Sequence, residues 1–331
     1  MKPALSVMVF TVLSGAGLGA LAIVALFDLA FSIGAIEPIA PAAVVSLAAI
    51  VGLILVIAGL CASVIHLANP KNAWRAASRW RTSWLSREAI VASSVIIVAA
   101  LYVVAIRGEA HPVWRSLLAL ATIVLASATL YCTAMIYASL KPIRQWYTPR
   151  VPLNYLLLGY ASGALVAVAV VRGHEIAPTP LAAVALAAFV LAALAKLDYW
   201  RFLHDPSGSL TIEQAIGVQH GVAPQPVPGR APAPRRSVMS ARLLDAGHSR
   251  HTFLTDEFVY TERSRIRTVL QAAMWIAGVL VPVLWLLFGL ARWEGGVLAC
   301  VACMIGLLAE RWLFFADARH TVRLYHGDRR T

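Results

Sequence analysis

Residues 42–67 read AAVVSLAAIVGLILVIAGLCASVIHL, an apolar run without Asp, Glu, Lys or Arg. A helix rises about 1.5 Å per residue, so this run is long enough to cross the ~30 Å hydrocarbon core of a bilayer. The whole chain shares this character, since 60% of its 331 residues are hydrophobic and 13% are charged, against about 45–50% and about 25% in soluble domains. This composition excludes a soluble enzyme, a disordered chain and a secreted disulfide scaffold. It predicts a protein that crosses the membrane several times.

Comparable runs recur along the chain. Because a bilayer offers no hydrogen-bond partner to an open strand edge, each run is expected to be a helix. Prolines stand between the runs, and only Pro282 falls inside one, where it predicts a kink. We therefore expect an all-α integral membrane protein of eight transmembrane helices, packed as two four-helix bundles. The predicted spans are residues 6–30, 42–67, 88–107, 114–139, 153–172, 180–203, 267–291 and 295–316.

Eight spans place both ends of the chain on one side of the membrane, which we call the terminal side. The chain has 28 Lys and Arg residues and a net charge of +12. Four of these basic residues fall on the opposite side, whereas 16 remain on the terminal side even when the eight between Arg230 and Arg267, in a long loop, are set aside. The positive-inside rule therefore predicts cytoplasmic termini. No basic cluster interleaved with aromatic residues stands on a soluble-looking segment, so no nucleic-acid partner is expected.

The chain divides into membrane and soluble parts. The one long loop holds five of the 17 prolines within residues 223–234, which predicts an extended stretch, and it turns basic after them. A segment this short cannot bury a core of its own, so it either lies on a partner or is a solvated linker. The predicted parts are residues 1–203 with six spans, 204–266 as a cytoplasmic loop, 267–316 with two spans, and 317–331 as a cytoplasmic tail.

Ionisable residues within the spans gather near the terminal side. A charged group inside a span is costly and marks a functional site by default. His66 ends the second span and Glu88 opens the third. The others are Lys196 and Asp198 in the sixth span and Glu310 and Arg311 in the eighth. The residues that flank loops on the opposite side are expected to be solvated: Asp28, Glu109, His111, His174 and Glu175.

His66 and Glu88 bracket a connection rich in Trp and Arg. Such residues at a membrane boundary often form only an anchoring belt, but a belt needs neither an imidazole nor a carboxylate at the hydrocarbon edge. Oxidation of a quinol releases two protons and two electrons, so a titratable group must lie beside the ring oxygen. Histidine and a partly desolvated glutamate suit this task. We therefore predict that His66 and Glu88 handle protons at a quinone site.

The connection itself is predicted to be helical from Asn72 onward. On that helix, Trp80 and Trp84 share one face, and Arg75 and Arg79 share another. Aromatic and apolar walls would hold a quinone ring, while its isoprenoid tail would leave sideways into lipid.

Four stretches of the chain form a specific pattern: residues 3–7 with 15–17, 66–70 leading to 73–76, 83–88, and 132–143. The most specific part is the connection between the second and third spans. These stretches resemble the membrane-anchor subunits of the DMSO reductase family (DmsC type, related to NrfD and PsrC). In that family, the residues that match His66 and Glu88 are associated with quinol binding and proton handling.

The resemblance and the polar pattern together define a predicted site. For its two tyrosines, ordinary helix packing is an equally good interpretation. The residues predicted to contact quinone are His66, Trp74, Trp84, Ser86, Arg87, Glu88, Tyr131 and Tyr137, and those predicted to meet a partner are Arg75, Arg79, Arg81 and Arg144.

The resemblance also implies partners and a location. The chain would anchor a molybdopterin catalytic subunit through a four-cluster ferredoxin-like iron–sulfur subunit, and it would exchange electrons with menaquinone or ubiquinone. It would lie in the bacterial inner membrane, with no metal, haem or iron–sulfur cluster of its own. The complex would be a sulfite dehydrogenase or a DMSO or sulfoxide reductase, and an inward-facing arrangement favours sulfite oxidation.

Two other functions fit the residues less well. A haem-b anchor needs axial histidines inside the spans, and only His66 of the nine His lies in one, at its end. The four Cys stand in apolar runs and do not have iron–sulfur spacing. A secondary transporter would place its substrate near the midplane between interrupted helices. Here the midplane is almost free of charge, and only Pro282 interrupts a span.

Overall fold

A computed structural model describes residues 3–65, 75, 77–177, 179–211, 264–289, 292–326 and 330. In this part of the chain eight helices are long and apolar enough to cross a membrane. Every predicted span is confirmed, and no end differs from its prediction by more than four residues. The helices are α1 Leu5–Ser32, α2 Ala42–Ile65, α3 Trp84–Arg107, α4 Pro112–Ala138, α5 Arg150–Gly173, α6 Thr179–His204, the helix Ser264–Gly289 that contains α10 (Ser264–Trp275) and α11 (Val281–Leu284), and α12 Trp293–Ala316.

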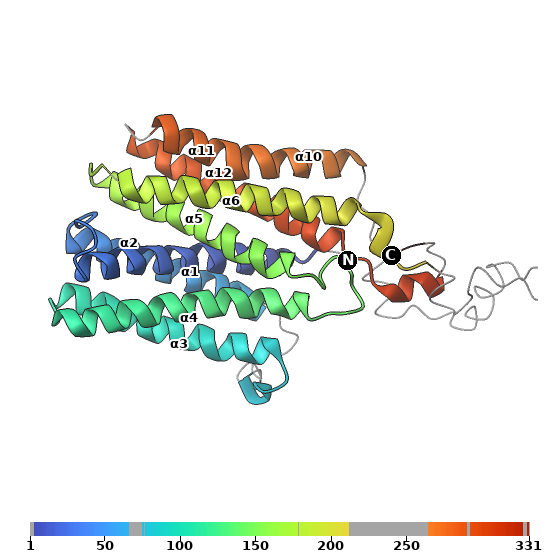
Figure 1. The fold of residues 1–331 in the computed structure, drawn as a ribbon, viewed down its shortest axis with the longest axis horizontal. Coiled ribbons are helices and arrows are strands. Elements are labelled where there is room, and N and C mark those ends of the chain that lie inside the picture. The colour runs from blue at the N-terminus through green and yellow to red at the C-terminus, as the bar shows by residue number, and fades with distance from the viewer. Residues whose placement is uncertain are drawn as a thin grey trace, which may run out of the picture.

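The helices lie side by side in two groups of four (Figure 1). Helices α1 to α4 form one group, and α5, α6, α10 with α11, and α12 form the other. The groups meet mainly along α1 and α5, and α1 also contacts α2, α4 and α12. Because α1 has neighbours on so many sides, 83% of its most apolar window is buried, more than in any other described span. The predicted fold class is confirmed.

Small residues allow the two groups to approach closely along this seam. A Cβ atom added to Gly19 on α1 would lie 1.9 Å from the carbonyl oxygen of Gly159 on α5, and one added to Gly163 would lie 2.1 Å from the amide nitrogen of Ala20. Glycine is therefore required where these backbones touch, as in other membrane helix pairs. The small residues of α1, such as Gly17 and Gly19, thus serve helix packing.

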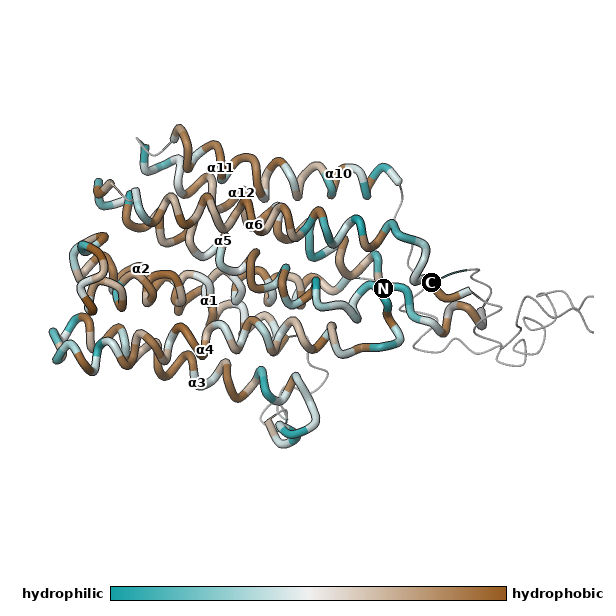
Figure 2. Tube along the Cα trace, in the orientation of Figure 1, coloured by the Kyte–Doolittle hydropathy of each residue, from teal (hydrophilic) through white to brown (hydrophobic). Residues whose placement is uncertain are grey.

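Both ends of the chain lie at the same end of the bundle, which we call the terminal end (Figure 1). Hydrophilic residues gather there, while the middle of each helix is predominantly hydrophobic (Figure 2).

The tail after α12 packs against the terminal end. Ala318 and Leu324 are buried, and the Thr321 amide donates to the Pro142 carbonyl at 3.1 Å. Residues 212–263, which include the Pro-rich stretch, lie outside the described residues.

Pro282 interrupts the hydrogen bonding of the seventh span. The short helix α11 (Val281–Leu284) contains it, and a π-helical turn lies on either side, at Ile276–Leu280 and Trp285–Gly289. Proline has no amide hydrogen to donate, and wider turns accommodate the lost bond. Two π-helical turns therefore flank Pro282, and the kink expected there stays a prediction.

Candidate functional site

The start of α3 positions Glu88. Ser83 has an extended backbone, and its hydroxyl accepts a hydrogen bond from the Ser86 amide at 3.4 Å, which caps the helix. The helix therefore begins at Trp84 and carries Glu88 in its second turn. Residues 77–79 form a separate 3₁₀ turn. The predicted continuous helix from Asn72 is wrong, because the extended Ser83 separates Trp80 from Trp84.

Glu88 is buried between α3 and α4 and is 5% exposed. The Thr133 hydroxyl on α4 donates a hydrogen bond to Glu88 Oε1, and it also lies 3.0 Å from the Thr129 carbonyl oxygen. A hydroxyl has one proton, so it donates to only one of these acceptors at a time. If Glu88 carries a proton, it can donate to Thr133, and Thr133 then donates to Thr129. Glu88 therefore has a hydrogen bond with Thr133 in both of its protonation states.

Trp84 and Tyr131 form an aromatic pair beside this carboxylate. Their rings meet edge to face with centroids 5.9 Å apart, and Tyr131 is 42% exposed on the outer surface of the bundle. Ser86 is buried on the same first turn of α3. The structure thus brings Glu88, Trp84 and Tyr131 together where α3 packs on α4. The exposed Tyr131 ring offers a stacking surface for a flat ring on the outside of the bundle.

Arg87 holds the preceding turn in place. Its guanidinium donates to the Trp80 carbonyl at 2.9 Å and to the Arg81 carbonyl at 2.8 Å, and it lies 4.3 Å from the centre of the Trp84 ring. These contacts fix the first turn of α3 against residues 79–83. Arg87 thus has a structural role beside the site, because it holds residues 80 and 81 against α3. Its contact with quinone stays a prediction.

Tyr137 belongs to a different cluster. Its ring stacks on Tyr155 at 6.1 Å and meets Trp146, Phe314 and Phe315 at 5.2–5.4 Å. The packing interpretation left open for this tyrosine agrees with these contacts. Tyr137 nonetheless follows Thr133, the hydrogen-bond partner of Glu88, by one helical turn on α4.

The remaining predicted site residues are His66, Trp74 and four arginines. His66 and Trp74 lie outside the described residues. Arg75, Arg79 and Arg81 are exposed. Arg144 is partly buried, and its guanidinium donates to the carbonyls of Phe202 at 3.4 Å and Asp205 at 2.9 Å. Arg144 thus joins the α4–α5 connection to the end of α6, while its predicted contact with a partner stays untested.

The prediction that Asp28 is solvated is wrong. Asp28 is 4% exposed and forms an ion pair with Arg115. It also accepts a hydrogen bond from the Tyr102 hydroxyl at 2.9 Å. This group joins α1, α3 and α4 at the end of the bundle opposite the terminal end. Phe27, Asp28, Phe31 and Arg115 line a cavity of about 540 Å³ there, which contains none of the predicted site residues.

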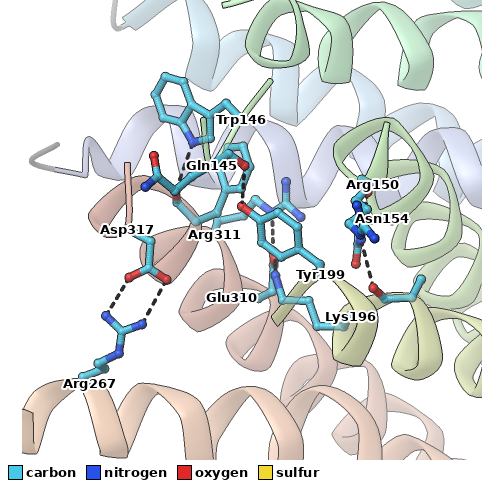
Figure 3. Close-up of polar contacts among 12 residues, drawn as sticks. Gln145, Trp146, Arg150, Asn154, Lys196, Tyr199, Arg267, Glu310, Arg311 and Asp317 are labelled. Atoms are coloured by element: carbon cyan, nitrogen blue, oxygen red, sulfur yellow. Dashed lines mark hydrogen bonds and ion pairs between the residues drawn. The ribbon is translucent and has the colours of Figure 1, made fainter. Parts of the chain in front are cut away.

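A second polar cluster lies inside the other helix group (Figure 3). Lys196 on α6 and Arg311 on α12 both donate to the carboxylate of Glu310, and all three side chains are buried. We call these three residues the buried charge cluster. The sequence placed these three residues near the terminal side but did not show that they pair.

The sequence analysis also missed Thr133 as a site residue. The available indication was a hydroxyl inside an apolar span, near the end of the bundle that carries Glu88.

Comparisons with known proteins show the family to which this chain belongs. The family model described as DMSO reductase anchor subunit (DmsC) matches residues 1–227. The chain belongs to this family. It is also 34% identical over 344 aligned positions to a subunit of the sulfite dehydrogenase of Allochromatium vinosum, covering 98% of this chain and 99% of that protein. The chain is thus a membrane anchor subunit of a DMSO reductase-family complex, and DmsC subunits assemble with catalytic and iron–sulfur subunits of oxidoreductases.

Proposed function

We propose that this DmsC-family anchor subunit exchanges electrons between membrane quinone and an iron–sulfur subunit on its terminal face. The observation that carries the proposal is the buried Glu88 carboxylate, bonded to Thr133 beside the Trp84–Tyr131 pair. A quinone reaction moves protons together with electrons, so it needs a buried group that is hydrogen-bonded in both protonation states. Glu88 meets this requirement, and the exposed Tyr131 ring lies on the outer surface, where a quinone would arrive.

The terminal face is the proposed docking surface. The exposed Arg75, Arg79 and Arg81 precede α3 at this end, close to where electrons would leave the site. The excess of Lys and Arg at the terminal end supports a cytoplasmic orientation of that end. The proposed location is the bacterial inner membrane. The proposed partners are a four-cluster ferredoxin-like subunit and, through it, a molybdopterin subunit. The similarity to a subunit of a sulfite dehydrogenase supports sulfite as the electron donor.

Glu88→Gln tests the proposal in the assembled complex with its partners. We expect quinone-linked turnover to fall about 100-fold, because glutamine keeps the size and hydrogen bond of Glu88 but cannot carry a proton. Turnover is measured with a soluble quinone analogue. The activity of the catalytic subunit with an artificial redox dye should stay at the wild-type level.

The matched control is Glu109→Gln, which alters an exposed carboxylate just beyond the other end of α3. It should retain full quinone-linked turnover. Equal losses of quinone-linked and dye-linked activity in Glu88→Gln would instead make Glu88 a structural residue and overturn the proposal.

The direction of electron flow has its own test. We expect sulfite to reduce quinone in the purified complex, because sulfite would donate two electrons that leave through the anchor. Quinone reduction is followed by its ultraviolet absorbance. Quinol-dependent reduction of a sulfoxide, without sulfite-dependent quinone reduction, would assign the complex to the reductase type.

A further inference from the structure

The buried charge cluster contains more positive than negative charge. Lys196 and Arg311 are cations, Glu310 is the carboxylate between them, and each of the three is 1–4% exposed. Their charges sum to +1 in a region of low dielectric, where an uncompensated charge is costly unless polar groups or water solvate it. The nearest other ion pairs, Arg150–Asp198 and Arg267–Asp317, are each balanced internally. The cluster therefore needs further solvation.

Unpaired polar atoms face this cluster. Asn154 Oδ1 is buried and has no hydrogen-bond partner among the described residues, and the buried Tyr155 hydroxyl and Arg311 Nη1 have at most each other. Nearly all buried polar groups in proteins have a partner or an ordered water. Three cavities of about 20, 10 and 20 Å³ adjoin these atoms and the cluster. Roughly 10–15 Å³ is enough for one water molecule when polar partners are present.

The cluster connects to the terminal end through Tyr199. The Lys196 ammonium lies 4.8 Å from the centre of the Tyr199 ring, and the Tyr199 hydroxyl donates to the Gln145 carbonyl at 3.0 Å (Figure 3). Gln145 lines a polar recess of about 290 Å³ together with Arg267, Asp317 and other residues of the terminal end. Tyr199 therefore lies between the cluster, which contacts its ring, and the recess, which its hydroxyl faces.

The cluster also connects to the candidate site in the other helix group. The Arg311 guanidinium lies 4.0 Å from the centre of the Tyr155 ring, and Tyr155 stacks on Tyr137. Arg311, Tyr155 and Tyr137 thus contact one another in turn across the seam between the two groups. Tyr137 and Thr133, the partner of Glu88, lie one turn apart on α4.

We propose that the buried charge cluster, with bound water, carries protons between the recess at the terminal end and Glu88. This inference rests on the proposed quinone reaction. Oxidation of one quinol breaks two O–H bonds, and the two protons leave along this route while the two electrons pass to the iron–sulfur partner. Quinone reduction runs the same steps in reverse. Glu88 is buried, so the protons that it exchanges need a polar path through the protein.

Tyr155→Phe tests the route in the full complex in liposomes. It removes one hydroxyl and keeps the ring that contacts Tyr137 and Arg311. We expect about a 10-fold loss of quinone-linked turnover and a larger solvent deuterium isotope effect, because proton transfer becomes slower. A purely structural role would not raise the isotope effect. Dye-linked activity should not change.

Tyr160→Phe is the matched control on the same helix. The Tyr160 hydroxyl bonds to Ser127 at 2.8 Å, away from the cluster, so this variant should keep the wild-type rate and isotope effect. Hydroxyl-radical labelling of the wild-type complex provides a readout that does not depend on activity. Radicals formed from bound water should oxidise Tyr155, which is 6% exposed, and leave Phe189, which is 2% exposed and lies outside the route, unlabelled.

An unlabelled Tyr155 would overturn the proposal, and so would a Tyr155→Phe complex with wild-type rate and isotope effect. An equal loss in Tyr160→Phe would also contradict it. If the wild-type complex keeps dye-linked activity but does not turn over quinone, the proposed function itself fails. The proton route then falls with it, whatever the labelling shows.

Discussion

Glu310→Gln is expected to lower the free energy of unfolding by about 3–5 kcal/mol, because it leaves Lys196 and Arg311 buried without a carboxylate between them. Glutamine fills the same volume, so the loss would come from charge and hydrogen bonding. The melting temperature of the purified chain in detergent, followed by tryptophan fluorescence, measures the effect.

The matched control for this prediction is Asp198→Asn. Asp198 on α6 also forms an ion pair, with Arg150 on α5 at 2.6 Å, but the Asp198 side chain is 53% exposed. An exposed pair contributes about 0–1 kcal/mol, so this variant should melt close to the wild type. Equal melting of Glu310→Gln and Asp198→Asn would mean that the carboxylate of Glu310 does not stabilise the two cations.

Hydropathy predicted the eight spans because each run is as long as the bilayer is thick, whatever its neighbours are. The start of α3 was placed four residues late for the same reason. Its first turn, Trp84 to Arg87, mixes polar and apolar side chains, so that the apolar run begins only after it. The signal that was available is Ser83, a favoured N-cap residue directly before Trp84.

The candidate site was only partly predictable. Glu88 stood out because a carboxylate at the edge of an apolar run is rare. Thr133 did not stand out, because its role depends on which face of α4 meets α3, and hydropathy does not reveal that face. Asp28 was misjudged in the same way. Its partners Tyr102 and Arg115 come from later helices, and only helix packing brings these residues together.

Gly19→Ala is expected to destabilise the chain by more than the ~1–3 kcal/mol typical of an overpacked core. The added methyl group would lie 1.9 Å from the Gly159 carbonyl oxygen, and a backbone atom cannot move aside by changing rotamer. Helices α1 and α5 would have to separate along the seam that joins the two helix groups. The readouts are the melting temperature in detergent and the yield of assembled complex.

Gly15→Ala separates this steric effect from any general sensitivity of α1 to alanine. Gly15 lies one turn before Gly19 on the same helix, and no atom lies within 4 Å of its added Cβ position. Alanine favours a helix over glycine by about 1 kcal/mol, so this variant should melt at or slightly above the wild-type temperature. Equal destabilisation by the two substitutions would mean that close contact with Gly159 does not limit the packing of α1. In that case the larger side chains around the seam, rather than the glycine contact, would hold the two helix groups together.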